Sequence, residues 1–276
     1  MSETMEDALW HKIRQSGFLG SRRQEVHFFE TVDSTNTLAL SMSKEGAATG
    51  TIVVAETQTM GRGRLGKTWS SPAGTGLYCT IILRPNIPLT QLARVTLAAG
   101  LAVAQAIDEV SGLFSMIKWP NDVLLGGKKV AGILAECDLT GGLGPAVALG
   151  VGINLGTSPD QFPSEVRTRA TSLSIVCGRT IGKGLMLSVL VDCVEREIER
   201  VEHGGFARIL SDWKRRDATA KQLLSWLTTD GQTICGQSLG PDNEGCLIIR
   251  DKAGRCHQVM SGDITLDPST LNDYFP

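Results

Sequence analysis

The chain has 276 residues, of which 42% are hydrophobic and 20% charged, a composition typical of a folded globular protein and not of a disordered one. Its 27 basic and 29 acidic residues give a formal net charge of −2, so we expect neither non-specific DNA binding nor attraction to an anionic membrane. Seven cysteines and four histidines are scattered without a CxxC pair, which argues against a zinc site and for reduced, mostly buried thiols in a cytoplasmic protein.

The N-terminal part of the chain predicts two helices and two strands. Residues 6–18 predict a leading helix and residues 27–30 a short strand, and no signal peptide is expected here. Residues 33–36, Asp-Ser-Thr-Asn, have side chains that begin helices, and the helix behind them ends at Gly46. Residues 51–56 are rich in β-branched side chains and predict the next strand.

A loop, a long helix and a series of strands make up the centre of the chain. The loop is rich in glycine and arginine, spans residues 58–76 and precedes a strand at 77–84. Apolar residues at helical spacing predict a helix over 90–110, and we expect no apolar run to reach the roughly 18 residues of a membrane-spanning helix. Further strands are expected at 116–119, 123–125, 129–136 and 146–154.

Two helices and a small β module complete the chain. The helices are expected at 184–203 and 206–216. Strands grouped with helices, without strict alternation, predict an α+β catalytic domain on a mixed or antiparallel sheet over residues 1–220. Residues 221–276 predict a small barrel-like module. Its expected strands are 223–228, 233–237, 246–250 and 256–260.

The segment 61–68, Gly-Arg-Gly-Arg-Leu-Gly-Lys-Thr, fits both the dinucleotide-binding pattern and the P-loop pattern. Both patterns need a helix directly after the loop, whereas residues 69–76 contain one proline and two glycines and do not predict one. Arg62, Arg64 and Lys67 instead predict a mobile basic loop that closes over a phosphate or carboxylate, with a solvated hairpin tip as the alternative.

Three other segments carry polar residues suited to a ligand. Residues 118–122, Lys-Trp-Pro-Asn-Asp, could serve a triphosphate and Mg²⁺ at one bend, or form an ordinary turn with a buried tryptophan. Ala131 and Gly132 leave space above a strand, as a pocket floor would, and Lys129 could reach into that space or remain an edge lysine. Residues 34–36 could contact a small polar ligand or only cap their helix.

In this order, the segments resemble those of the biotin protein ligases over nearly the whole chain. The matching segments are 33–36, Gln58 with 61–66, 69–72, 118–122, 129–132 and 152–154. The resemblance implies a class II synthetase-like catalytic domain followed by an SH3-like domain. It also implies an ATP-dependent ligase that forms biotinyl-5′-AMP and passes biotin to one lysine of the biotin carboxyl carrier protein of acetyl-CoA carboxylase or a related carboxylase.

The resemblance further implies roles for individual residues. Lys129 and Arg64 would be catalytic. The biotin-binding residues would be Ser34, Thr35, Asn36, Gln58, Gly61, Arg62, Lys129 and Gly132. The residues for ATP and the adenylate would be Arg62, Arg64, Trp69, Lys118, Asn121, Asp122 and Asn154, with Mg²⁺ on Asp122.

Three alternatives remain open at this point. The chain could be a lipoate or octanoate protein ligase, a module that binds the carrier without catalysis, or a transcription factor. Some 30 residues precede the 33–36 segment, which is too few for a winged helix-turn-helix with its linker, so we expect no DNA binding. The expected partners are the carrier domain, biotin and ATP, without a membrane, and a homodimer is left open.

Overall fold

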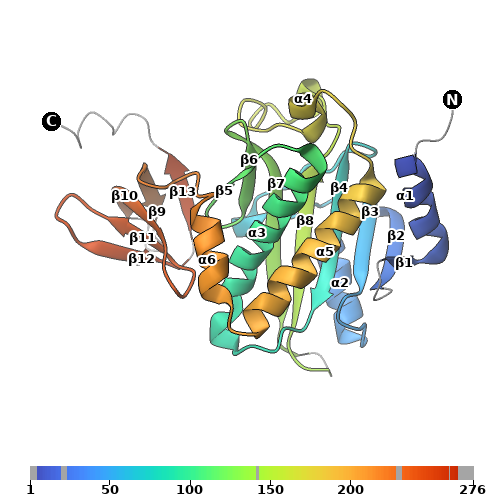
Figure 1. The fold of residues 1–276 in the computed structure, drawn as a ribbon, viewed down its shortest axis with the longest axis horizontal. Coiled ribbons are helices and arrows are strands. Elements are labelled where there is room, and N and C mark those ends of the chain that lie inside the picture. The colour runs from blue at the N-terminus through green and yellow to red at the C-terminus, as the bar shows by residue number, and fades with distance from the viewer. Residues whose placement is uncertain (1–4, 20–23, 141–142, 228–231, 261, 267–276) are drawn as a thin grey trace.

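The computed structural model describes residues 5–19, 24–140, 143–227, 232–260 and 262–266, which form a large mixed sheet with helices and a second, smaller sheet (Figure 1). The large sheet has the order β1-β2-β3-β4-β8-β7-β6-β5, in which β2 and β3 are parallel and the other neighbours antiparallel. Its strands are β1 (Phe18–Leu19), β2 (Gln24–Val32), β3 (Ile52–Gln58), β4 (Gly76–Leu83), β5 (Met116–Lys118), β6 (Asp122–Leu125), β7 (Lys128–Asp138) and β8 (Ala146–Asn154). The predicted α+β architecture on a mixed sheet is confirmed.

The helices cover the two faces of this sheet unequally. The long helices α3 and α5 lie side by side on one face, with α1 and α6 beside them (Figure 1). The short helix α2 packs on the opposite face, against β3, β4, β7 and β8. The helices are α1 (Met5–Ser16), α2 (Thr35–Lys44), α3 (Leu92–Ser111), α4 (Leu173–Cys177), α5 (Lys183–Glu202) and α6 (Phe206–Lys214).

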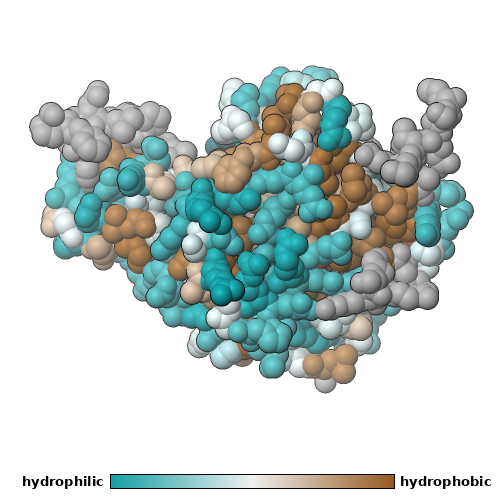
Figure 2. Space-filling model, viewed as in Figure 1, coloured by the Kyte–Doolittle hydropathy of each residue, from teal (hydrophilic) through white to brown (hydrophobic). Residues whose placement is uncertain are grey.

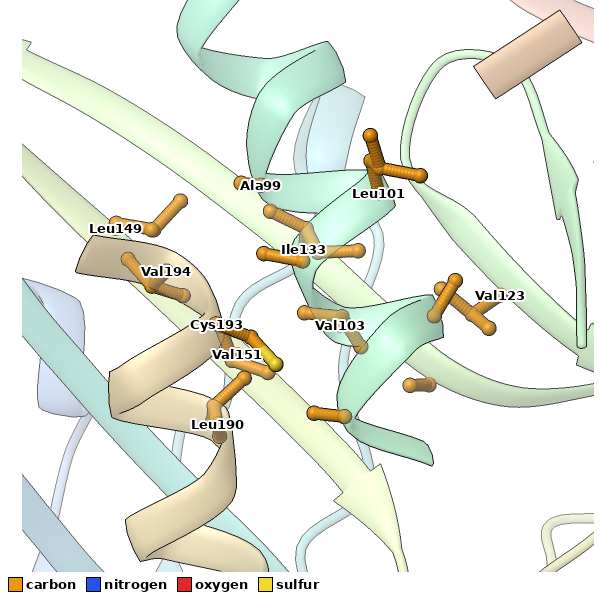
Figure 3. Close-up of a cluster of buried hydrophobic side chains, with 14 of the residues drawn as sticks. Ala99, Leu101, Val103, Val123, Ile133, Leu149, Val151, Leu190, Cys193 and Val194 are labelled. Atoms are coloured by element: carbon orange, nitrogen blue, oxygen red, sulfur yellow. The ribbon is translucent and has the colours of Figure 1, made fainter. Parts of the chain in front are cut away.

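The main hydrophobic core fills the space between the sheet and the α3–α5 pair. Leu101 and Val103 of α3 and Leu190 and Val194 of α5 are buried over the sheet (Figure 3). Because side chains alternate along a strand, β8 sends Val147, Leu149, Val151 and Ile153 into this core. Between them, the small residues Ala148, Gly150 and Gly152 of β8 belong to the opposite face.

The smaller sheet is antiparallel and has the order β12-β11-β10-β9-β13. Its strands are β9 (Leu223–Leu227), β10 (Thr233–Pro241), β11 (Leu247–Arg250), β12 (Cys256–Val259) and β13 (Asp263–Leu266). The sequence did not predict β13, and the edge strands β12 and β13 do not pair within the described residues, so the sheet forms no closed barrel there. The Trp119 indole Nε1 of the main domain donates to the Gly245 carbonyl at 3.0 Å, which joins the two sheets.

Helix α3 begins later than predicted, and its length and composition meet the criteria for a membrane-spanning helix. Thr90 lies in a 3₁₀ turn (Leu89–Gln91), and α3 proper begins at Leu92 and ends at Ser111, followed by Gly112 with a left-handed backbone. By length and composition alone, Leu89–Ser111 could cross a membrane, so the expectation that no segment qualifies is wrong. The helix nevertheless belongs to the protein core, because most of its residues are buried under α5 and the sheet.

The cysteines are all free thiols, as predicted, but only some are buried. Cys79, Cys193 and Cys246 are buried, whereas Cys137 and Cys256 are exposed, so the expectation of mostly buried thiols is wrong. Burial raises the pKa of the Cys79 thiol to about 12, which leaves it without thiolate character at neutral pH.

The outer surface of the helical layer is largely hydrophilic along α3 and α6 (Figure 2). Apolar residues gather at α4, where Ile175 and Val176 are exposed (Figure 2). The helical face therefore has the solvated character of an ordinary protein surface, and the polar residues singled out in the sequence lie elsewhere.

Candidate active site

Three glycines form the floor of the candidate site, on the sheet face opposite the main core. Gly132 of β7 lies directly across from Gly152 of β8, and Gly150 is the next residue along on the same face. A Cβ atom at Gly132 would lie 2.8 Å from Trp69 Cζ3, and one at Gly152 would lie 2.5 Å from Trp69 Cε2. A Cβ atom at Gly150 would collide with Asn36 Oδ1. These positions require glycine because other side chains pack directly onto the backbone.

The prediction that Ala131 and Gly132 both border the ligand space is wrong for Ala131. Ala131 is fully buried in the core under the helices. The alternation of side chains along β7 puts neighbouring residues on opposite faces, so only Gly132 faces the site.

A β-bulge turns Lys129 toward the site. In the β6–β7 pairing, Val123 opposes Ala131 and Leu124 opposes Lys129, so that Val130 is an extra residue. Val130 and Ala131 are both buried in the core. In a regular strand, Lys129 would share the face of Ala131; the bulge instead puts its side chain on the face of Gly132. The Lys129 Nζ and Cε lie 3.3 and 3.2 Å from the position of a Cβ at Gly132.

Lys129 is held between an aromatic ring and a carboxylate. Its ammonium nitrogen lies 5.2 Å from the centroid of Trp69 and 2.6 Å from Asp122 Oδ1. The side chains of Lys129 and Asp122 are 33% and 24% exposed, so both remain accessible to a ligand. The predicted site residues Trp69, Asp122, Lys129 and Gly132 therefore form one group.

The start of α2 contributes a buried polar group. Ser34 is the N-cap residue of α2, but its side chain makes no cap hydrogen bond. Thr35 donates to Gln58 Oε1 from both its backbone N–H, at 2.9 Å, and its hydroxyl, at 3.1 Å. The Asn36 amide donates to the Leu134 carbonyl at 3.1 Å and to Glu136 Oε2 at 2.9 Å. Thr35 and Asn36 thus join α2 to the strands around the glycine floor.

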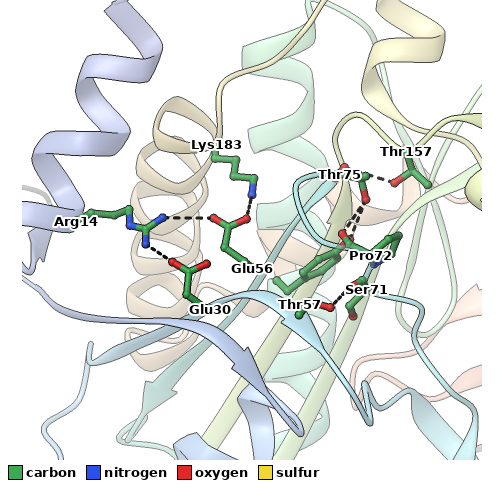
Figure 4. Close-up of polar contacts among 10 residues, drawn as sticks. Arg14, Glu30, Glu56, Thr57, Ser71, Pro72, Thr75, Thr157 and Lys183 are labelled. Carbon is green, nitrogen blue, oxygen red and sulfur yellow. Dashed lines mark hydrogen bonds and ion pairs between the residues drawn. The ribbon is translucent and has the colours of Figure 1, made fainter.

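The base of the glycine- and arginine-rich loop is tied to β3. Gln58 Nε2 donates to Ser71 Oγ at 2.8 Å. The Thr57 hydroxyl donates to the Ser71 carbonyl at 2.7 Å (Figure 4). Beside this contact, Glu56 pairs with Lys183 at 2.5 Å and lies 3.7 Å from Arg14 (Figure 4). The strand that begins the loop is therefore anchored to both α1 and α5.

The loop itself forms a tight hairpin-like turn. Arg62 and Thr68 make a bridge, and the Gly63 N–H donates to the Lys67 carbonyl at 2.7 Å. No helix follows before β4, so the P-loop and dinucleotide-binding interpretations do not fit. Arg62 contacts Glu136, and its Nη1 donates to Thr37 Oγ1 at 3.3 Å.

The bend between β5 and β6 faces the same loop. Arg64 Nη1 lies 3.5 Å from Asn121 Oδ1, and the Asn121 amide donates to the Ile133 carbonyl at 2.8 Å. Lys118 lies opposite Asp122 in the β5–β6 pair. The bend therefore meets the loop through Asn121, which also bonds to β7.

The remaining predicted residues have more peripheral positions. Gly61 packs so closely on Trp69 and Gln58 that a Cβ atom there would collide with the Trp69 carbonyl. Asn154, at the end of β8, is buried and donates to the Thr171 carbonyl at 2.9 Å. Its assignment to the ribose stays a prediction.

Three polar residues of this region were missed in the sequence. Glu136 contacts Asn36 and Arg62, Thr80 contacts Thr35 and Asn36, and Ser71 contacts Gln58. Alternation along β7 could have identified Glu136, since it shares a strand face with Gly132. Thr80 was detectable only as a hydroxyl within an otherwise buried apolar strand.

The oxygen ligands of the site are better suited to a magnesium ion that arrives with a nucleotide than to one that the protein binds permanently. Within the ranges that the structure describes, no group of three or more His, Cys, Asp or Glu side chains could hold a metal. Asp122 offers a single carboxylate beside the Asn121 amide. Mg²⁺ commonly binds proteins through one or two carboxylates together with substrate phosphates, so these residues suit that mode.

Comparison with known proteins gives concordant similarities. The profile of the biotin/lipoate A/B protein ligase family matches residues 28–154, which include every candidate site residue. The bifunctional ligase/repressor BirA of Bacillus subtilis is 36% identical over 243 residues, 88% of this chain and 74% of that protein. The biotin–[acetyl-CoA-carboxylase] ligase of Paracoccus denitrificans is 36% identical over 226 residues, 81% of this chain and 93% of that protein. A structure of the biotin protein ligase from Aquifex aeolicus in complex with biotin and ATP has 27% identity and a TM-score of 0.76, covering 88% of this chain and 98% of that one.

Proposed function

The chain belongs to the biotin/lipoate A/B protein ligase family, and on this premise we propose that it makes biotinyl-5′-AMP from biotin and ATP and transfers the biotinyl group to a lysine of a carboxylase carrier domain. The relatives that carry the name of a biotin–[acetyl-CoA-carboxylase] ligase support this substrate class.

The observation that carries the proposal is the position of Lys129. The bulge in β7 holds its ammonium group over Trp69, beside Gly132 and within reach of the bend that contains Asp122. A cation above a floor of glycines suits a reaction in which two anionic groups must come together, because it offsets their repulsion.

In the first step, a carboxylate oxygen of biotin attacks the α-phosphorus of ATP, and the bond from that phosphorus to the pyrophosphate oxygen breaks. Lys129 and Arg64 would stabilise the charge on the carboxylate and the α-phosphate as this exchange proceeds. Asp122 would hold the magnesium ion that enters with ATP, and that ion would supply positive charge for the leaving pyrophosphate.

In the second step, the amine of the carrier lysine attacks the acyl carbon, AMP leaves with the bonding electrons, and the amine loses a proton. The acyl-adenylate is already activated, so no enzyme nucleophile is needed. This agrees with the buried Cys79 thiol, whose pKa lies near 12.

The polar group at the start of α2 is suited to the ureido ring of biotin. The buried Ser34 and Thr35 and the half-buried Gln58 offer hydroxyl and amide groups that can both donate and accept. Trp69, whose ring lies over Gly132 and Gly152, would pack against the adenine of the adenylate.

Further properties belong to the same proposal. We place the enzyme in the cytoplasm, with Mg-ATP as its cosubstrate and with residues 221–276 as an SH3-like C-terminal domain. We expect no specific DNA binding, and a homodimer is compatible with the proposal.

The test is mass spectrometry of a biotin carboxyl carrier domain after incubation with the protein, biotin and Mg-ATP. The expected result is one biotinyl group on one lysine. Parallel incubations with lipoate or octanoate test the neighbouring activity of the family. Modification by these acids and not by biotin would reassign the substrate, and no modification by any of them would favour a carrier-binding module without catalysis.

A further inference from the structure

Glu136 joins two segments of the site that are far apart in the sequence. Its Oε2 accepts a hydrogen bond from Asn36 Nδ2 at 2.9 Å, and its Oε1 contacts Arg62 Nη2. Asn36 belongs to α2, and Arg62 belongs to the basic loop. The side chain of Glu136 is 22% exposed, so water screens these contacts less than it would on an open surface.

Glu136 also belongs to a continuous path of hydrogen bonds beneath the site. The Thr80 hydroxyl lies 2.7 Å from Asn36 Oδ1 and 2.8 Å from Thr35 Oγ1. Thr35 donates to Gln58, which donates to Ser71. The path in full is Arg62, Glu136, Asn36, Thr80, Thr35, Gln58 and Ser71. Both of its ends lie in the loop region, so the path fixes the loop to the sheet at two points.

The buried residues of this path have little freedom to move. Thr80 is fully buried and Asn36 is 3% exposed, so an unsatisfied polar atom on either would be costly. Asn36 has both amide donors directed at oxygen atoms of β7, those of Leu134 and Glu136. Glu136 is therefore held in one position, and its carboxylate in turn restricts the orientation of the Arg62 side chain.

The Arg62 side chain contacts those of Glu136 and Thr37. The Arg62 side chain is 45% exposed and long, and an unanchored arginine of this kind samples many rotamers. A carboxylate matches a guanidinium with a charge-assisted hydrogen bond and holds it in one orientation. A second guanidinium nitrogen, Nη1, donates to Thr37 Oγ1 at 3.3 Å.

We propose that Glu136 is a positioning residue of the ligase site, which orients Arg62 for the anionic ligand. This inference rests on the proposed function. Glu136 does not touch the reacting atoms; it acts through Arg62.

The test is a double-mutant cycle with Glu136→Gln and Arg62→Gln, measured by biotin-dependent ATP–pyrophosphate exchange. Loss of a partner that orients a binding residue typically costs about 10- to 100-fold, so we expect Glu136→Gln to lower kcat/KM for biotin by about tenfold or more. Because Glu136 acts through Arg62, the double variant should be no less active than Arg62→Gln alone. The thermal midpoint of Glu136→Gln should remain near that of the wild type.

Glu30→Gln is the matched control, since Glu30 pairs with Arg14 at 2.6 Å outside the site. It should leave exchange unchanged. If Glu136→Gln fails to fold, Glu136→Asp keeps the charge with a shorter side chain and enters the same cycle. Wild-type kcat/KM in the Glu136 variant, or losses that multiply in the double variant, would overturn the inference. Absence of exchange by the wild type would instead count against the proposed function.

Discussion

Lys129 faces the candidate site because Val130 is an extra residue in β7. We expect Lys129→Ala to lower the rate of biotinyl-adenylate formation by about 10²–10³, because loss of one group that stabilises transition-state charge typically has this effect. The measurement is biotin-dependent exchange of pyrophosphate into ATP.

The neighbouring Lys128 provides the matched control, since it is exposed and has the same chemistry. Lys128→Ala should retain wild-type exchange and show the same thermal midpoint as Lys129→Ala. Equal rates in the two variants would contradict the assignment of Lys129.

Substitution of Gly150 tests whether the close packing on the glycine floor requires glycine. A Cβ atom in Gly150→Ala would collide with Asn36 Oδ1, so Asn36 must move and lose hydrogen bonds to Thr80 or β7. We expect a loss of about 1–3 kcal/mol in the free energy of unfolding, the cost of leaving buried polar groups unsatisfied. Denaturant titration measures it. Gly156→Ala is the control, because a Cβ atom there would meet only the Thr75 carbonyl at 3.9 Å; equal stability of the two variants would refute the packing argument.

At the scale of secondary-structure elements, the basic loop over residues 61–67 should respond to ligand. The loop has three like charges, and the polar side-chain partners of its arginines include Glu136, Thr37 and Asn121. An anionic ligand supplies further partners, so we expect slower amide hydrogen exchange in this segment with biotin and ATP present. Peptides from α5 serve as the internal reference. Unchanged exchange in the loop under saturating ligand would speak against its closure.

Most elements were predictable from sequence because their local patterns agree with their tertiary setting. The segments 33–36, 61–68, 118–122 and 129–132 were recognised, and the structure brings them to one face of the sheet. The bulge at Val130 and the contacts of Glu136 and Thr80 were not predictable, because they depend on strand register and on partners up to 100 residues away. The short elements β1, α4 and β13 were missed because two to five residues carry too little periodicity.

At the scale of the whole molecule, Trp119 links the site bend to the smaller sheet. Trp119→Phe removes the hydrogen bond to the Gly245 carbonyl, and we expect the free energy of unfolding to fall by about 1 kcal/mol from that bond. Because Trp119 adjoins Lys118 and Asn121, KM for ATP should rise while biotin affinity stays constant.

Trp213→Phe is the matched control for Trp119→Phe. Trp213 is also buried, but its indole N–H has no hydrogen-bond partner within the described structure. The difference between the two variants therefore isolates the bond to Gly245. If Trp213→Phe costs as much stability and raises KM for ATP equally, the link between the sheets has no special role.

The hydrogen-bonded path from Arg62 to Ser71 also constrains the order of folding. Asn36 and Glu136 are separated by 100 residues, and their meeting requires β4, β8 and β7 to be paired. Such long-range closure comes at a large loss of chain entropy and is slow compared with helix formation. During synthesis, the basic loop emerges from the ribosome long before Glu136 does. The nascent chain therefore carries its arginines without this counter-charge for many seconds, and ligand affinity arises only when the sheet closes.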